Sequence, residues 1–202
     1  MVGPEPFLNF IHAYEKNVQA LGAVYVDCWD TIKSVPSALQ SPLDALGITN
    51  LASFTVHHCH RAFGLVLEGK QGWKLAFSGD TRPCDRLVEY ARDCTLLIHE
   101  ATFEDDLQDE AVAKRHSTTS EAIEIGQKSK AFRTILTHFS QRYPCIPVWS
   151  NKFPKTIGFA FDFMTVNLAD LVDLPSTVPA LRKLFKMVSM DDDGGGGGRE
   201  ET

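Results

Sequence analysis

The sequence predicts an α/β fold, because strand-like and helix-like patterns alternate along most of the chain. Two short uncharged runs, Thr95–Ile98 and Thr134–Thr137, are typical of strands buried on both faces. The segment between them, about 118–130, has a helical pattern. Two β-rich runs, 62–67 and 73–77, are joined by a glycine-containing turn and predict a hairpin.

A lead-in segment, residues 1–50, precedes this alternation. Residues 5 to about 19 predict an amphipathic helix, because four apolar residues recur at helical spacing: Phe7, Phe10, Ile11 and Tyr14. A second, short helix is predicted to begin at Ser41, with Pro42 in its first turn, and to end at Gly47. We therefore divide the chain into this lead-in, a domain of residues 51–190 and a tail of residues 191–202.

Polar residues of metal-ligand type stand at or near the ends of the predicted strands. Phe54, Val56 and His58 alternate with other residues, which predicts a strand that ends in an inward histidine. Asp80 follows the second strand of the hairpin, and His138 follows the 134–137 run. These positions indicate a metal site assembled from separate segments.

Weaker patterns complete the chain. A helix is predicted after Pro83, and another is opened by Thr118 and Glu121, which form a capping-box signature. Residues 157–168 predict one or two strands. A last amphipathic helix after Pro179 is predicted from Leu181, Leu184, Phe185 and Val188. The tail, 191–202, contains five consecutive glycines and no apolar residue, so we expect it to be disordered.

Length and composition are those of one globular domain or of one half of a larger one. The chain has 202 residues, 44% of them hydrophobic and 23% charged. No run approaches the roughly 18 apolar residues of a membrane span, so no membrane partner is expected. The tail contributes −4 of the net charge of −6, which leaves about −2 for the body. That balance neither indicates nor excludes a local phosphate-binding patch.

The five cysteines have no paired spacing, and no signal peptide is visible at the amino terminus. These features favour a reducing compartment. No Cys-x-x-Cys is present, which disfavours a structural zinc knuckle. A local zinc site around Cys59, between His58 and His60, stays open as an alternative.

His58, Asp80 and His138 together offer the donor types that zinc accepts, namely imidazole nitrogen and carboxylate oxygen. Two metal ions about 3.5–4 Å apart need a ligand that reaches both, and the two oxygens of Asp80 suit that role. Taken singly, each residue also has an ordinary interpretation. Asp80 can be a turn or cap residue, and either histidine can be a core residue with satisfied hydrogen bonds.

Several segments together resemble tRNase Z (ribonuclease Z), a member of the metallo-β-lactamase superfamily that removes the 3′ trailer of precursor tRNA. The resemblance covers about residues 50–165 and is most similar to the carboxy-terminal half of the long eukaryotic form. The matching segments are Val56–Gly64, Ser78–Pro83, His99–Phe103, His116–Thr118 and Thr137–Tyr143. It implies an αββα sandwich of which this chain holds the carboxy-terminal half.

The resemblance also implies roles for individual residues. His58 would bind one Zn²⁺, His138 a second, and Asp80 would bridge them. His116 would stand at the scissile phosphate as a proton donor, and Glu100 would fix its tautomer. A strand-end salt bridge stays open as the other interpretation of Glu100. Substrate contacts are implied for His99, Ser117, Thr118 and Arg142.

One departure from the family is large. The His-x-His-x-Asp-His segment, which supplies the other ligands, occurs nowhere in this sequence. We therefore expect little cleavage of precursor tRNA by the chain alone, and association with itself or with a complete subunit. A non-catalytic binding or regulatory module and another superfamily hydrolase are the alternatives. The family resemblance places the function in the nucleus, the mitochondrion or both.

Overall fold

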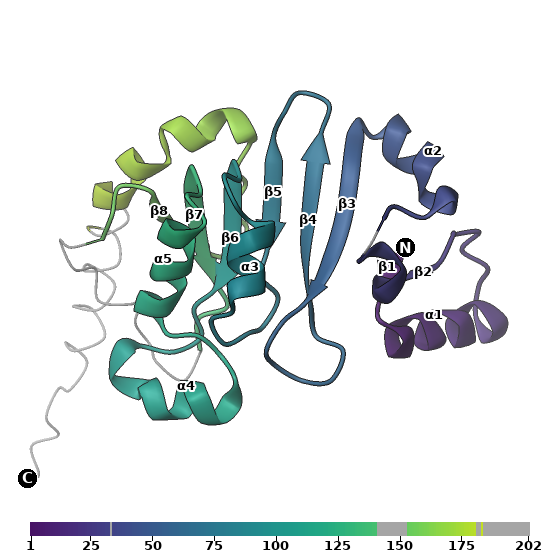
Figure 1. The fold of residues 1–202 in the computed structure, drawn as a ribbon, viewed down its shortest axis with the longest axis horizontal. Helices are drawn as coiled ribbons and strands as arrows, with labels where there is room; N and C mark the ends of the chain where they lie inside the picture. Colours follow the sequence, from purple (N-terminus) through teal and green to yellow (C-terminus); the bar gives the residue numbers. More distant parts are fainter. Residues whose placement is uncertain (33, 141–152, 181–182, 184–202) are drawn as a thin grey trace, which may run out of the picture.

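The computed structural model describes residues 1–32, 34–140, 153–180 and 183. A six-stranded sheet with the order β3-β4-β5-β6-β7-β8 runs through its centre (Figure 1). Its first three strands form antiparallel pairs in sequence: β3 (Ile48–Thr55) pairs with β4 (Phe63–Gly69), and β4 pairs with β5 (Lys74–Phe77). The next three run parallel to β5: β6 (Leu96–Glu100), β7 (Arg133–Thr137) and β8 (Ile157–Phe159). The carboxyl ends of β3, β5, β6 and β7 consequently meet at one edge.

Two helices cover one face of the sheet. α3 (Asp85–Tyr90) packs on β3, and α5 (Thr119–Lys128) packs on β6 and β7 (Figure 1). The apolar cluster beneath them includes Phe54, Val66, Ala76, Leu87, Leu97 and Ile125. Because β6 is buried on both faces, its sequence reads as a continuous apolar run instead of an alternating one.

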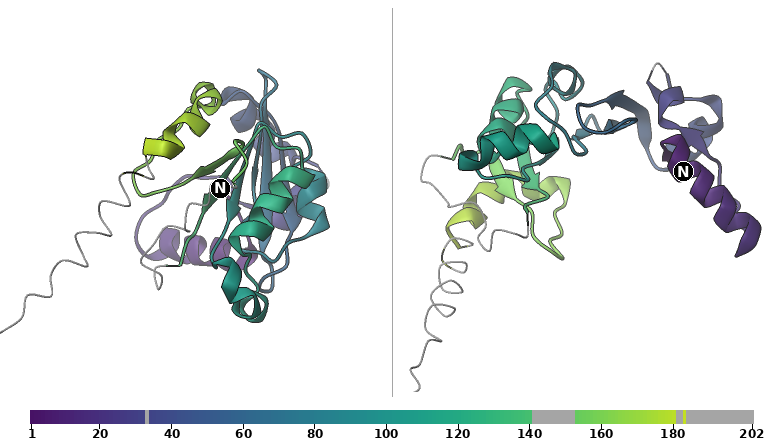
Figure 2. Two further views of the ribbon diagram at one scale, coloured as in Figure 1. Left: turned by 90° about the vertical axis from the view of Figure 1, so that its left-hand side faces the viewer. Right: turned by 90° about the horizontal axis from the view of Figure 1, so that it is seen from below.

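The opposite face is covered at its two sides by different segments. The 3₁₀ helix η3 (Leu168–Val172) and the helical residues 174–180 pack on β6 and β7, and Figure 2 shows them across the sheet from α5. On the other side, α2 (Ser37–Ala45) covers β3 through Leu39 and Leu43. Between these covers lies Phe77, which is 40% exposed. One sheet with its helical layer agrees with the expected half of an αββα sandwich.

The amino-terminal segment contains α1 (Glu5–Asn17), which confirms the first predicted helix. A two-stranded parallel sheet, β1 (Val2–Gly3) with β2 (Val26–Asp27), and the 3₁₀ helix η1 (Cys28–Thr31) accompany it. Leu8 is the one buried residue of α1, whereas Phe7 is 42% and Phe10 65% exposed. The apolar side of α1 is thus largely uncovered by the part of the chain that the structure describes.

Two predicted element boundaries were wrong. α2 begins at Ser37, directly after Pro36, so Pro42 lies inside the helix and not in its first turn. β3 ends at Thr55, and His58 lies three residues beyond it in a loop. The chain leaves the sheet because residues 59–62 form a turn in which Arg61 adopts a positive φ of 60°.

Most of the remaining elements confirm the predictions. The hairpin is present, with Leu65 opposite Phe77, and α5 has a capping box in which Thr118 and Glu121 bond reciprocally. Residues 157–168 contribute one strand, β8. The helix α4 (Gln108–Lys114), after the 3₁₀ helix η2 (Asp105–Leu107), was not predicted.

Two predictions fall outside the described residues: the apolar positions of the last helix (Leu181, Leu184, Phe185 and Val188) and the tail 191–202. Within the described ranges, no helix combines the length and the apolar character that a membrane span requires.

Candidate metal centre and proton-transfer pair

The strand-end loops bring the predicted ligands together at one edge of the sheet. Asp80 follows β5 and is preceded by Gly79, whose φ is +60°. A Cβ on Gly79 would lie 2.7 Å from the backbone oxygen of Phe63, so this close turn requires glycine. His138 follows β7 with a positive φ of 64°, a conformation that is uncommon for a residue with a side chain.

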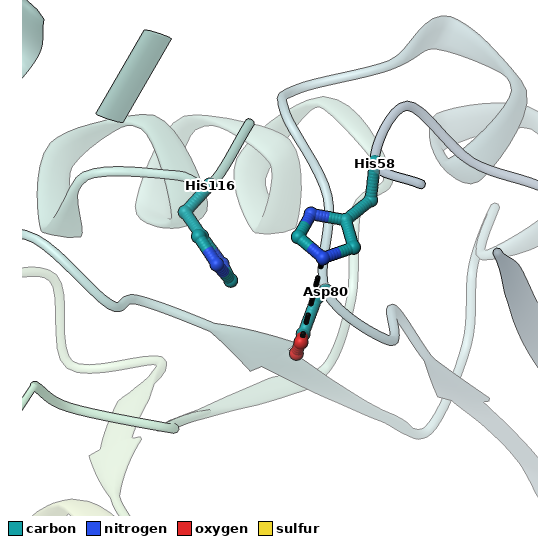
Figure 3. Close-up of side chains that lie close together, drawn as sticks. All are labelled: His58, Asp80 and His116. Atoms are coloured by element: carbon teal, nitrogen blue, oxygen red, sulfur yellow. Dashed lines mark ion pairs between the residues drawn. The ribbon is translucent and has the colours of Figure 1, made fainter. Parts of the chain in front are cut away.

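Asp80 lies between two imidazoles. Its Oδ2 is 3.9 Å from Nε2 of His58, and its Oδ1 is 3.8 Å from Nε2 of His138. Figure 3 shows the His58 ring directed at this carboxylate. The side chains of Asp80 and His138 are 42% and 50% exposed, so the site is open to solvent.

The other ring nitrogen of each flanking histidine is held by the protein. Nδ1 of His58 donates to the backbone oxygen of Arg115 at 3.0 Å, since a carbonyl can only accept. Nδ1 of His138 lies 2.7 Å from Oγ1 of Thr102, whose own proton goes to Oε2 of Glu100. His138 therefore donates to Thr102. When the rings are neutral, this arrangement leaves Nε2 of each without a proton on the side of the Asp80 carboxylate, which is the tautomer that a metal ligand needs.

Glu100 is the buried centre of the surrounding network, at 2% exposure. Its Oε1 accepts from the backbone of Thr81 at 2.8 Å and from Nδ1 of His116 at 2.9 Å. Its Oε2 accepts from the backbone and hydroxyl of Thr102 and from the backbone of Ser117. All five groups that contact Glu100 donate a hydrogen bond to it. This arrangement suits an ionised carboxylate, because an ionised carboxylate can only accept hydrogen bonds.

His116 stands between the two flanking histidines. Its ring centroid lies 4.7 Å from that of His58 and 5.5 Å from that of His138. With His58 and Asp80 it forms a group whose ligand atoms all lie within 4.8 Å of one another, and it forms a second such group with Glu100 and His138. Figure 3 shows the rings of His116 and His58 converging on Asp80. Since Nδ1 of His116 is bonded to Glu100, Nε2 remains available to the site.

This donor set suits a divalent cation such as zinc. It combines imidazoles of fixed tautomer with a carboxylate that presents one oxygen to each side. Three imidazoles and two carboxylates also make the site negatively charged when the rings are neutral, which favours a bound cation. The residues present thus fit a metal ion, and Asp80 presents one oxygen to His58 and the other to His138.

Three of the four residues expected to contact substrate are buried. His99 and Ser117 are 0% exposed and Thr118 is 1% exposed. Ser117 donates its hydroxyl to the backbone of Thr81, and Thr118 caps α5. This placement gives them no surface for direct contact, so the structure does not support that expectation for these three residues. Arg142 lies outside the described residues.

The fully buried His99 has a separate environment. Its Nδ1 lies 2.6 Å from the backbone oxygen of Glu100, and its Nε2 has no hydrogen-bond partner among the described residues. Burial lowers the pKa of His99, because the charged ring would lose its hydration. His99 is therefore a neutral core residue next to the site.

The alternative zinc site around Cys59 gains no support. Cys59 and His60 are exposed, and neither belongs to the two metal-type groups formed by the described residues. Two further residues, Thr102 and Arg115, orient His138 and His58 and were not among the predicted site residues. Thr102 lies in the segment His99–Phe103 that carries part of the family resemblance, and that was its visible signal.

Comparisons with known proteins agree with this geometry. A family model described as a beta-lactamase superfamily domain matches residues 17–139. tRNase Z TRZ3, mitochondrial, of Arabidopsis thaliana is 37% identical over 242 residues, covering 95% of this chain and 27% of that protein. Zinc phosphodiesterase ELAC protein 2 of Homo sapiens is 45% identical over 152 residues, covering 75% of this chain and 18% of that protein.

A solved structure, the long form RNase Z from yeast, superposes with a TM-score of 0.78 at 29% identity. It covers 91% of this chain and 30% of the yeast chain. The matched part of the chain spans 27% of the length of Arabidopsis TRZ3, 17% of Arabidopsis TRZ4 and 18% of the human protein. The chain thus corresponds to a small part of these relatives. It belongs to the beta-lactamase superfamily, and its relatives include tRNase Z proteins and a zinc phosphodiesterase.

Proposed function

We propose that the chain carries part of a zinc-dependent endoribonuclease site of the tRNase Z type, which removes the 3′ trailer of precursor tRNA. One observation carries the proposal: Asp80 lies within 3.9 Å of Nε2 of His58 and of His138, whose Nδ1 atoms are held elsewhere. The names of the relatives, tRNase Z and zinc phosphodiesterase, support the choice of reaction and metal.

In this proposal His58 would hold one zinc ion, His138 would hold the second, and Asp80 would be a ligand of both. Bound zinc would supply Lewis-acid stabilisation of negative charge on a phosphate oxygen. The protein holds these ligands in place through the backbone oxygen of Arg115 and the hydroxyl of Thr102. Such outer contacts commonly change metal affinity 10- to 100-fold when they are removed.

His116 is proposed to donate a proton to the 3′ leaving oxygen. Glu100 accepts the Nδ1 proton at 2.9 Å, which fixes the ring and leaves Nε2 to carry the transferred proton. The buried carboxylate also stabilises the positive charge on the doubly protonated ring. The site residues Glu100 and His116 thus form a carboxylate–imidazole pair directed at the metal position.

The ligand set of the chain alone is small. His58, Asp80 and His138 leave several coordination positions of two ions to water, and the His-x-His-x-Asp-His segment is absent from this sequence. We therefore propose that cleavage requires further ligands from a complete subunit or from more of the same protein. Precursor tRNA is the proposed substrate, and the mitochondrial names of relatives favour that compartment, with the nucleus as a second site.

Calorimetric titration of the purified chain with zinc chloride tests the metal site. We expect binding by the wild type, a loss of at least tenfold in affinity for Asp80→Asn and His138→Ala, and no change for His60→Ala. His60 is the matched control because it is exposed and lies two residues from His58. Absence of binding by the wild type would reject the zinc site and favour a non-catalytic module.

His116→Ala separates the two roles that its position allows. As a proton donor, it should leave zinc affinity within about twofold of the wild type. A loss equal to that of His138→Ala would make His116 a metal ligand instead. Incubation of the chain with precursor tRNA and zinc completes the test: efficient trimming without any partner would contradict the proposed dependence on further ligands.

A further inference from the structure

Arg82 joins the three loops that carry the site. It stands two residues after Asp80, in the same loop. Its backbone N–H donates to the backbone oxygen of His57 at 2.9 Å, which ties this loop to the one that carries His58. Its Nη1 donates to the backbone oxygen of His116 at 2.7 Å. One residue therefore connects the loops of His58, Asp80 and His116.

The guanidinium of Arg82 is held in turn by Glu121. Nη1 of Arg82 donates to Oε2 of Glu121 at 2.7 Å, Nη2 bonds to Oε1, and both side chains are about 20% exposed. Glu121 also accepts from the backbone of Thr118 and from the amide of Gln108. Burial raises the pKa of Glu121, but these hydrogen bonds lower it by more, so its pKa lies below the ordinary value.

The arrangement requires the shape of an arginine side chain. The planar fork presents two parallel N–H groups to the Glu121 carboxylate while Nη1 also reaches the carbonyl of His116. A lysine offers a single ammonium and cannot make this set of contacts with the same geometry. An ion pair with Glu121 that served stability alone would not need a further bond to a backbone oxygen. Arg82 makes such a bond, and its acceptor is the backbone oxygen of His116.

We infer that Arg82 is a positioning residue whose guanidinium, held by Glu121, sets the placement of His116 relative to Asp80 and His58. It acts on the backbone of His116, whereas Glu100 acts on the ring. Arg82 makes no contact with the Asp80 carboxylate that the structure records. The inference rests on the proposed function where zinc binding is the readout.

The experiment compares Arg82→Met with Arg133→Met in the complete chain. Arg133 is a matched control because its guanidinium also donates to backbone oxygens, those of Leu171 and Val172, at the opposite end of β7 from His138. Both substitutions remove a guanidinium that donates to backbone oxygens, and Arg82 in addition pairs with the Glu121 carboxylate. Melting temperature, zinc chloride affinity and the ¹⁵N ring shifts of the histidines are measured for each.

We expect both variants to lower the melting temperature, but only Arg82→Met to weaken zinc binding, by about tenfold or more. In the metal-free chain, only Arg82→Met should shift the ring ¹⁵N resonances of His116 away from the single tautomer. Equal effects of the two variants on every readout would reduce Arg82 to a structural residue and overturn the inference. The metal-free spectra remain decisive if the wild type binds no zinc, which would contradict the proposed function separately.

Arg82→Lys and Glu121→Gln provide the test if Arg82→Met does not fold. Each keeps part of the contact set, so we expect an intermediate shift of His116 and an intermediate loss of zinc affinity. The double variant should lose no more than Arg82→Lys alone, because the two residues act through one contact set. Additive losses would show that they act independently and would contradict the inference.

Discussion

The site edge of the central sheet and the amino-terminal segment, residues 1–47, are held in place by different means. At the site edge, polar side chains bond to one another, and Glu100 alone accepts five hydrogen bonds at 2% exposure. In the amino-terminal segment, α1 buries Leu8 but leaves Phe10 65% exposed. Ion pairs of Glu5 and Asp27 with Arg61 connect the segment to the loop that carries His58.

This difference shows where the fold is self-contained. The strand-end loops are joined to one another by hydrogen bonds of Glu100 and Arg82 within the described residues. The apolar side of α1 is left largely uncovered by the described residues. We therefore expect substitutions at the site edge to be costly for stability and those on α1 to be nearly neutral, with effects on association instead.

The largest effect is expected for Glu100→Gln. The glutamine amide would turn an N–H₂ group toward two or three of the five donors. The free energy of unfolding should therefore fall by on the order of 3–5 kcal/mol. Urea denaturation measures this change. Glu124→Gln is the control, since Glu124 is 59% exposed and pairs with Lys128; its effect should stay below about 0.5 kcal/mol. Similar losses for both would contradict the buried network.

The next effect concerns thiol reactivity. Burial raises the pKa of both Cys28 and Cys94 to about 11, from 9.0, which leaves about a hundredfold less thiolate at a given pH. Cys59 is exposed. Iodoacetamide at pH 8, followed by peptide mass spectrometry, should therefore label Cys59 well before the other two. Rapid labelling of Cys94 in the folded chain would show that α3 and its neighbours open in solution.

A smaller effect is expected from acid. Because burial lowers the pKa of His99, the unfolded state binds the proton first, at the ordinary histidine pKa of about 6.5. The stability from neutral His99 is present above that pH and is lost as the pH falls below it. In His99→Leu, the urea midpoint should fall less between pH 7 and pH 5 than in the wild type. His60→Leu should retain the full decrease, and an unchanged slope in His99→Leu would contradict this placement.

The smallest change in stability is expected for Phe10→Ser, below about 0.5 kcal/mol, because this side chain is 65% exposed. Association should change more: light scattering should detect oligomers of the wild type that become smaller in the variant. A monodisperse monomer of the wild type would contradict the predicted self-association. A loss of stability above about 1 kcal/mol would indicate that α1 packs against another surface in solution.

Much of the site could be predicted from the sequence because ligand-type residues mark the strand ends. His58, Asp80 and His138 were singled out on that ground, and the structure places the two imidazoles on either side of the Asp80 carboxylate. The roles of zinc ligands stay predictions. The roles of Thr102 and Arg115 could not be predicted, since a threonine hydroxyl and a backbone oxygen acquire their function only from their neighbours in space.

The sequence by itself determined the α/β alternation, the hairpin and the capped helix α5, because hydrophobic period and capping residues act over a few positions. Only the tertiary structure decided that His58 leaves the sheet and that His99, Ser117 and Thr118 are buried. It also decided that Arg82 reaches across to His116. Those outcomes depend on the order of strands in the sheet, which brings together loops separated by tens of residues, and no local pattern records that order.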